Sequence, residues 1–139
     1  MQLEAAASPQ PPVLIVDREH EALSDLVCAS ARPTRGITLL WDELKRATVL
    51  RAGHAPEEVV RLDSRVYFSD LDRREERMVR LVYPDEAAAP NLEPVTSTIG
   101  AALIGLRAGD VFRWRGADGG VRSVRINRVE APARPRLRK

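Results

Sequence analysis

The spacing of apolar residues changes after residue 52, and this change constrains the fold more than any other feature of the sequence. Over 17–52 apolar side chains recur every three or four residues, which is the spacing of amphipathic helices. Over 59–130 they mostly alternate with polar ones, which is typical of strands with one buried face. A chain of 139 residues is long enough to bury one ordinary core. The sequence therefore predicts an α+β fold in which helices precede a sheet.

Two short helices joined by a tight turn are predicted in the first region. Asp17 is expected to cap the first helix, and Pro33 follows its end. Gly36 is expected to permit the reversal, and the second helix is expected to reach about Thr48. The pattern predicts an antiparallel helical hairpin. The apolar positions of its two faces are Leu23, Leu26 and Val27, then Ile37, Leu40, Trp41 and Leu44.

The second region begins with two predicted strands and a loop. Alternation over 60–68 predicts the first strand, and 69–74 is a polar turn. The apolar run over 77–83 predicts a second, more central strand. Three prolines over 84–94 indicate a loop.

A short helix and a hairpin are predicted at the end of the second region. Ser97 is expected to cap a helix over 98–104, and Gly105 is expected to stop it. The Asp-Gly-Gly run at 118–120 predicts a tight turn between two strands. Together with the strands before them, these elements predict an antiparallel sheet with one helix packed on a face.

Side chains that could act as nucleophile, base or metal ligand are few and badly spaced. Cys28 and His20 are eight residues apart on one predicted helix, about 12 Å along its axis, which is too far for a hydrogen bond. Cys28 is therefore expected to be a half-buried structural residue. The other imidazole, His54, has no partner at a metal-binding spacing. The sequence predicts no catalytic residue, no metal and no cofactor.

The composition of the N-terminal segment and of the whole chain bears on location. The single cysteine excludes an internal disulfide, which fits a reducing compartment. Residues 1–12 are small, polar and rich in proline, and we expect them to be disordered and not a secretory signal. The apolar runs are too short to cross a membrane. We expect a cytoplasmic protein.

Basic residues gather near the C-terminus. Residues 107–139 hold ten basic and three acidic side chains, and 131–139 are expected to form a disordered basic tail. Alternation places Arg122 and Arg128 on the opposite side of a strand from Arg125. A solvated sheet face, a nucleic-acid contact and a contact with an acidic partner all remain open. The candidate nucleic-acid contacts in the tail are Arg134, Arg136, Arg138 and Lys139.

Four segments of the chain resemble a known family. The stretch VTSTIGAALIGLRAGDV (95–111) is similar to the helix-and-turn signature of the C-terminal domain of GreA/GreB transcript cleavage factors. The stretches DSRVYFSD (63–70) and EERMVRLVYP (75–84) look like the smaller branch called regulator of nucleoside diphosphate kinase. The helix motif ELKRA (43–47) also fits that branch, so the resemblance covers about 15–130.

The resemblance implies both an architecture and a partner. It implies a short coiled-coil hairpin at 13–55 followed by an FKBP-like domain at 56–130. The resemblance implies binding to bacterial RNA polymerase, because proteins of this family bind it, and in the cleavage factors the C-terminal domain docks on the rim of its secondary channel. The family's rim-contacting turn falls on Thr96, Ser97, Thr98 and Ile99 in this sequence.

The resemblance also implies what this chain does not do. In cleavage factors a long hairpin carries acidic residues that help to hold a catalytic Mg²⁺. The tip in this sequence has no carboxylate, although a hard cation needs oxygen ligands. We therefore expect a monomeric, non-enzymatic transcription regulator that competes with cleavage factors, with possible contact to DNA near the polymerase. The alternative is a basic module that binds nucleic acid directly. The tip residues are Arg32, Pro33, Thr34 and Arg35.

Overall fold

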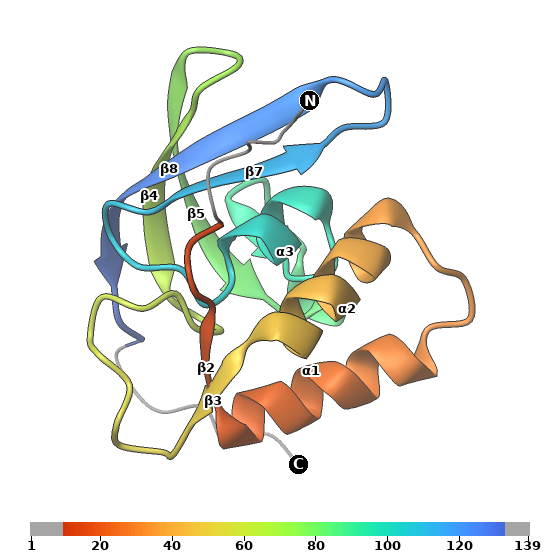
Figure 1. Ribbon diagram of the computed structural model, residues 1–139, viewed down its shortest axis with the longest axis vertical. Coiled ribbons are helices and arrows are strands. Elements are labelled where there is room, and N and C mark those ends of the chain that lie inside the picture. The colour runs from red at the N-terminus through yellow and green to blue at the C-terminus, as the bar shows by residue number, and fades with distance from the viewer. Residues whose placement is uncertain (1–9, 133–139) are drawn as a thin grey trace, which may run out of the picture.

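A five-stranded sheet with three α-helices layered on one of its faces makes up most of residues 10–132, which are the residues that the computed structural model describes (Figure 1). The strand order is β6-β5-β4-β8-β7. All neighbours are antiparallel except β5 and β6, which are parallel. This arrangement confirms the α+β class. The strands are β4 (Arg65–Asp70), β5 (Glu75–Val82), β6 (Leu92–Pro94), β7 (Val111–Arg115) and β8 (Val121–Glu130).

The helices are stacked in the order α3, α2, α1 outward from the sheet. Helix α3 (Thr98–Leu103) contacts β6 and β7, α2 (Arg35–Arg46) packs on α3, and α1 (Asp17–Ala29) packs on α2 (Figure 1). Both helices predicted in the first region are therefore confirmed. The expected cap of α1 is wrong, because the helix begins at Asp17 itself and its N-cap is Val16. The Asp17 carboxylate instead accepts a 2.7 Å hydrogen bond from the adjacent backbone N–H.

A two-stranded parallel sheet joins the ends of the helical region. It pairs β2 (Leu14–Val16) with β3 (Thr48–Leu50), and the Thr48 N–H also donates to the carbonyl of Val13 at 2.8 Å. The prediction that the second helix reaches Thr48 is wrong, because α2 ends at Arg46. The β-branched pair of Thr48 and Val49 favours the strand once a partner backbone is available.

The first predicted strand of the sheet begins five residues late. Residues 60–64 form a turn: Asp63 has a positive φ of 70°, and the Ser64 hydroxyl accepts a 2.9 Å hydrogen bond from the Arg61 N–H. Val60 and Leu62 are nevertheless buried. The alternation therefore predicted correctly that these two residues are buried, but it predicted wrongly where the strand begins.

The segment predicted as a loop over 84–94 contains regular structure. It opens with a 3₁₀ turn, η1 (Pro84–Glu86), and closes with β6. Strand β6 lies at the edge of the sheet, where a proline such as Pro94 is tolerated because no neighbouring strand needs its missing N–H. The sheet therefore has a fifth, parallel strand that the sequence did not predict.

The β7–β8 hairpin is confirmed, but a bulge changes the face of its last residues. Gly119 has a positive φ of 85° in the turn, as the sequence predicted. The register between β4 and β8 shifts between Tyr67 and Phe68, which places Arg128 opposite Tyr67. Because an extra residue in one strand reverses the alternation beyond it, Arg128 and Arg125 share a face. The predicted separation of these two arginines is wrong.

One core spans the helices and the sheet. Leu23 of α1 and Leu40 of α2 belong to the same buried cluster as Phe68 of β4 and Phe112 of β7. The segment just before β2 also contacts the folded chain, because the Arg46 guanidinium donates to the Pro11 carbonyl at 2.8 Å. Within residues 10–132, no helix has the length and apolar character needed to span a membrane. Residues 1–9 of the segment predicted as disordered lie outside the described residues.

Candidate functional site

The turn that leads into α3, residues 96–99, is held by its serine. We call these four half-buried residues the α3 turn. The Ser97 hydroxyl accepts a 2.9 Å hydrogen bond from the Gly100 N–H, which confirms Ser97 as the N-cap. The same hydroxyl donates toward Glu93, whose Oε2 lies 2.6 Å away. Ser97 is therefore engaged within the fold on both its donor and its acceptor side.

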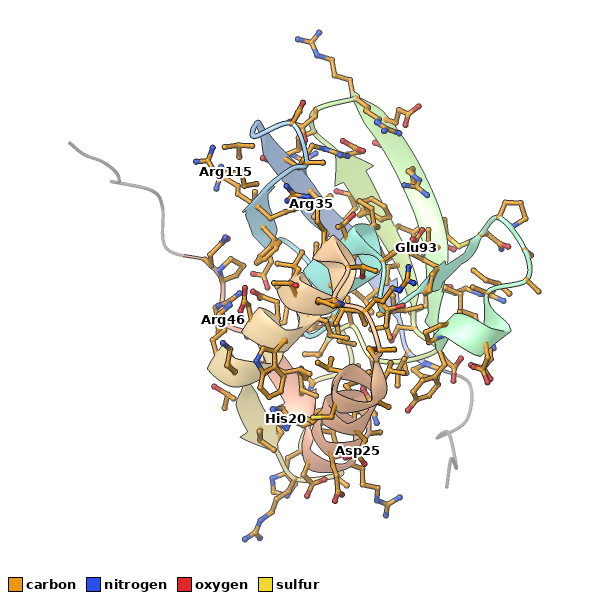
Figure 2. The ribbon with its side chains drawn as sticks, turned by 90° about the vertical axis from the view of Figure 1, so that its right-hand side faces the viewer. His20, Asp25, Arg35, Arg46, Glu93 and Arg115 are labelled. Carbon is orange, nitrogen blue, oxygen red and sulfur yellow. The ribbon has the colours of Figure 1, made fainter. Side chains whose placement is uncertain are left out.

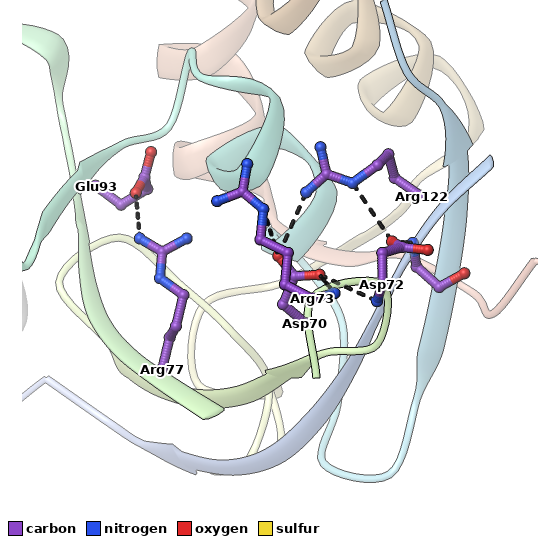
Figure 3. Close-up of polar contacts among 7 residues, drawn as sticks. Asp70, Asp72, Arg73, Arg77, Glu93 and Arg122 are labelled. Atoms are coloured by element: carbon purple, nitrogen blue, oxygen red, sulfur yellow. Dashed lines mark hydrogen bonds and ion pairs between the residues drawn. The ribbon is translucent and has the colours of Figure 1, made fainter. Parts of the chain in front are cut away.

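An arginine extends this contact to the sheet. Nη2 of Arg77 lies 3.6 Å from Oε1 of Glu93 (Figure 3). Because Glu93 also accepts from Ser97, the three residues form a continuous polar chain from β5 to α3. The Arg77 side chain is half-buried at 33% exposure and that of Glu93 is 16% exposed, so solvent screens their interaction less than that of a fully exposed pair. Sequence reasoning missed Glu93 and Arg77, because nothing local indicates that they meet.

The two threonines of the α3 turn differ from its serine. In the described part of the chain, neither the Thr96 nor the Thr98 hydroxyl has a hydrogen-bond partner. Ile99 packs against the core from a half-buried position. The turn therefore carries two hydroxyl groups that the described part of the fold leaves without a hydrogen-bond partner, beside an apolar side chain packed on the core.

The α3 turn lies against the start of α2. A Cβ atom on Gly36 would lie 1.9 Å from the Thr96 carbonyl oxygen and 2.7 Å from the Ser97 carbonyl carbon. Gly36 lies in the first turn of α2 and is buried, so the expectation that it permits a chain reversal is wrong. It permits close helix–turn contact instead. The structure thereby brings together two segments that the sequence singled out separately.

The second of these segments is the connection between α1 and α2. We call its residues 32–35 the helical tip. All four of its residues are exposed, and the Thr34 hydroxyl caps α2 by accepting from the Ile37 N–H at 3.1 Å. No Asp or Glu occurs between residues 26 and 41. The tip therefore has no carboxylate, the side-chain group by which proteins usually hold a magnesium ion.

An open pocket of about 220 Å³ lies between parts of α1 and α2, and Pro33 of the tip is one of its lining residues. Its walls include Val27, Ile37 and Trp41, and the Trp41 side chain is 39% exposed. Cys28 also lines the pocket and is exposed, so the expectation of a half-buried cysteine is wrong. His20 lies elsewhere on α1, where its Nε2 is 2.9 Å from the Leu44 carbonyl oxygen (Figure 2).

Two glutamates of the helices are buried and carry perturbed pKa values. Burial raises the pKa of Glu43, although Arg46, with Nη2 at 2.7 Å, acts in the opposite direction. Burial likewise raises the pKa of Glu19 against the effect of Arg61, whose Nε lies 3.1 Å away. Glu19 therefore links α1 to the turn before β4, whereas the Glu43 contact lies within α2.

The sheet has its own buried carboxylate at the end of β4. Oδ2 of Asp70 lies 3.3 Å from Nη2 of Arg122, and its Oδ1 accepts hydrogen bonds from the N–H groups of Asp72 and Arg73 (Figure 3). The Asp70 side chain is 1% exposed. This arrangement closes the β4–β5 turn and ties it to β8.

The remaining sequence expectations concern metals and the tail. Among residues 10–132, no group of three or more histidine, cysteine or acidic side chains is placed to share a metal ion. The tail arginines and lysine predicted to touch nucleic acid lie outside the described residues. They are Arg134, Arg136, Arg138 and Lys139.

Comparison with known proteins assigns this fold to a class, the transcription elongation factors of the GreA/GreB type. The family model described as "Transcription elongation factor, GreA/GreB, C-term" matches residues 55–131. The chain belongs to the GreA/GreB family, as the sequence predicted.

Relatives narrow this assignment to one branch. Over 107 residues the chain is 36% identical to the regulator of nucleoside diphosphate kinase of Escherichia coli K12, covering 76% of this chain and 79% of the relative. The protein of the same name from Shigella flexneri has the same identity and coverage. A solved structure, the transcription elongation factor GreA/GreB of Nitrosomonas europaea, superposes with a TM-score of 0.67 at 33% identity, covering 87% of this chain and 99% of that one.

Proposed function

We propose that this protein is a non-enzymatic transcription regulator that docks on bacterial RNA polymerase near the secondary channel through its α3 turn. The observation that carries the proposal is the pair of Thr96 and Thr98 hydroxyls, which have no hydrogen-bond partner among residues 10–132, on a turn held by the Ser97 cap. A surface held in place before binding loses little conformational freedom on docking. By occupying the same surface of the polymerase, the protein would compete with transcript cleavage factors in the cytoplasm.

The proposal assigns the family's architecture to this chain. The sheet and α3 correspond to the FKBP-like domain at 56–130, and α1 with α2 corresponds to a short form of the coiled-coil hairpin at 13–55. The two helices have 13 and 12 residues, so each arm is only about 20 Å long. The protein acts as a monomer in this proposal.

The proposal includes the absence of transcript cleavage activity. Cleavage by this family's hairpin requires carboxylates at the tip, and this tip presents Arg32 and Arg35 instead. Two arginines repel a divalent cation rather than hold it. The short arms also reduce the distance that the tip can reach into the polymerase.

Recovery of polymerase with the tagged full-length protein tests the docking surface. We expect Thr96→Ala/Thr98→Ala to recover much less polymerase than the wild type, because both candidate contact hydroxyls are lost while Ser97 still caps the helix. Thr38→Ala/Thr48→Ala is the matched control, since both of these threonines are exposed and neither belongs to the α3 turn. An excess of a cleavage factor should displace the wild-type protein. Equal recovery by the two double variants would remove the docking assignment.

A cleavage assay on backtracked transcription complexes tests the second part. We expect no stimulation of transcript cleavage at any concentration of the protein, and inhibition of cleavage when a cleavage factor is also present. Stimulated cleavage that disappears in Arg32→Ala/Arg35→Ala would overturn the proposal, because it would give the tip a catalytic role without carboxylates.

A further inference from the structure

The face of the sheet that points away from the helices is rich in arginine. Neighbouring residues on these strands, such as Val66, Val79 and Val124, are buried beneath the helices, so the alternate positions face outward. Four strands contribute arginines to this outer face, and all of them are exposed. Within the described residues they are Arg65, Arg80, Arg113, Arg115, Arg125 and Arg128.

Four of these arginines form a row along β7 and β8, which we call the basic row: Arg113, Arg115, Arg125 and Arg128. Residues two apart on a strand are about 6.8 Å apart, so Arg115 and Arg113 are neighbours on β7. Arg125 pairs with Val111 and is therefore the diagonal neighbour of Arg113, about 7–8 Å away. The bulge in β8 brings Arg128 onto the same face, which extends the row to about 20 Å.

Most of the charge in the basic row is not neutralised by the protein. Arg128 pairs with Glu130 at 2.9 Å and lies over the Tyr67 ring at 4.2 Å. Among residues 10–132, no carboxylate oxygen lies within 4.0 Å of the guanidinium groups of Arg113, Arg115 or Arg125. Like charges held this close repel one another, and a bound polyanion would relieve the repulsion.

The outer face has the features of a nucleic-acid surface rather than of a protein interface. Protein interfaces have an apolar centre, whereas protein–DNA interfaces are polar and positively charged. Val121 is the one strongly exposed large apolar side chain that the described residues place on this face. Tyr67 is the aromatic side chain on it, and the Arg128 guanidinium covers its ring, so single-stranded bases have no stacking platform.

We infer that the basic row binds the phosphate backbone of duplex DNA. The row follows a line of regularly spaced charges and offers no group that would read a base edge, so the binding is independent of sequence. It is also independent of the proposed docking site. The row lies on the face of the sheet that points away from the helices, whereas the α3 turn lies on the side that the helices cover, so the two are separate surfaces.

Fluorescence anisotropy of the full-length protein with a labelled DNA duplex of about 20 base pairs tests the inference. The logarithm of the binding constant falls with the logarithm of salt concentration by about 0.9 for each phosphate neutralised. We therefore expect Arg113→Gln/Arg125→Gln to bind more weakly than the wild type and to have a salt slope shallower by about 2. Arg18→Gln/Arg51→Gln is the matched control, because both residues are exposed, make no ion pair within the described chain and lie off the sheet. The control should keep the wild-type slope.

Several results would overturn the inference. They are absence of duplex binding by the wild type at 50 mM salt, equal weakening in the two double variants, and tighter binding of single-stranded DNA or of an RNA hairpin than of the duplex. Wild-type affinity in Arg113→Gln/Arg125→Gln combined with loss of binding on removal of 133–139 would assign the contact to the tail. Polymerase recovery by Arg113→Gln/Arg125→Gln should match the wild type, which separates failure of this inference from failure of the docking proposal.

Discussion

Gly36 and Thr96 touch through their backbones, 60 residues apart in the chain. A Cβ atom on Gly36 would lie 1.9 Å from the Thr96 carbonyl oxygen, a separation that real Cβ atoms do not reach. The contact holds the start of α2 against the α3 turn. It therefore fixes the position of the exposed helical tip relative to the Thr96 and Thr98 hydroxyls. A partner that binds both surfaces would bind them in one defined geometry.

Gly36→Ala is expected to destabilise the protein by about 1–3 kcal/mol, because α2 must move away from α3 to admit the methyl group. In an open helix the same change stabilises by up to about 1 kcal/mol, so the sign of the effect reports the contact. Urea unfolding followed by circular dichroism measures it. Thr38→Ala, at an exposed position of α2, is the control and should be neutral or slightly stabilising. A Gly36→Ala variant as stable as the wild type would show that the helix and the turn do not meet as described.

Ser97→Ala is expected to lower the free energy of unfolding by about 1 kcal/mol, because the Gly100 N–H loses its cap and Glu93 loses a hydrogen-bond donor. Thr96→Ala provides the comparison, since its hydroxyl makes no hydrogen bond within residues 10–132 and its loss should cost less than about 0.5 kcal/mol. Thermal or urea unfolding of both variants gives the difference. A larger loss in Thr96→Ala than in Ser97→Ala would contradict the assignment of the cap.

Features set by short stretches of sequence were predictable. The Ser97 cap, the Gly105 stop with its positive φ of 79° and the β7–β8 turn each depend on residues only a few positions apart. The bounds of α1 and α2 were predicted to within a few residues for the same reason. Thr48 was wrongly assigned to the end of the second helix. It lies in β3, which forms only beside β2, and no local pattern in the sequence predicts that pairing.

Features that depend on distant contacts were not predictable. Gly36 has the sequence context of a glycine in a turn. Only the position of Thr96 shows that a glycine is needed there to let two backbone segments pack closely. Likewise, the bulge opposite Tyr67 places Arg128 beside Arg125, although strict alternation separates them. The two parts of the candidate site were found from a family resemblance and from the missing carboxylates, but their contact required the packed structure.

Stability should depend on pH through Glu19 and Glu43. Burial raises the pKa of each above the ordinary value of 4.5, despite the opposing effects of Arg61 and Arg46. Between pH 4.5 and the raised pKa the native state therefore binds more protons than the unfolded chain, so this contribution to the free energy of unfolding rises as pH falls and is complete below 4.5. In Glu19→Gln/Glu43→Gln this contribution is absent.

Urea unfolding at a series of pH values from 7 to 4.5 measures that contribution as a difference. As the pH is lowered, the free energy of unfolding of the wild type should rise relative to that of Glu19→Gln/Glu43→Gln. Glu57→Gln/Glu58→Gln changes the net charge equally at exposed positions, and its difference from the wild type should stay nearly constant. If the free energy of unfolding of the wild type instead falls relative to that of Glu19→Gln/Glu43→Gln on acidification, the ion pairs affect the two pKa values more than burial does.

Asp70→Asn is expected to destabilise the protein by about 2 kcal/mol. The buried Asp70 carboxylate accepts from two turn N–H groups and contacts the Arg122 guanidinium. In the variant the amide NH₂ group, which is itself a donor, would face one of these donors. Asp72 also lies near Arg122, with Oδ2 at 3.4 Å from its Nε, but its side chain is 36% exposed. Asp72→Asn should therefore cost less than about 1 kcal/mol, because solvent screens an exposed pair. Chemical unfolding of the two variants side by side gives the ratio. Equal losses would mean that Arg122, rather than the buried position of Asp70, determines the strength of the contact.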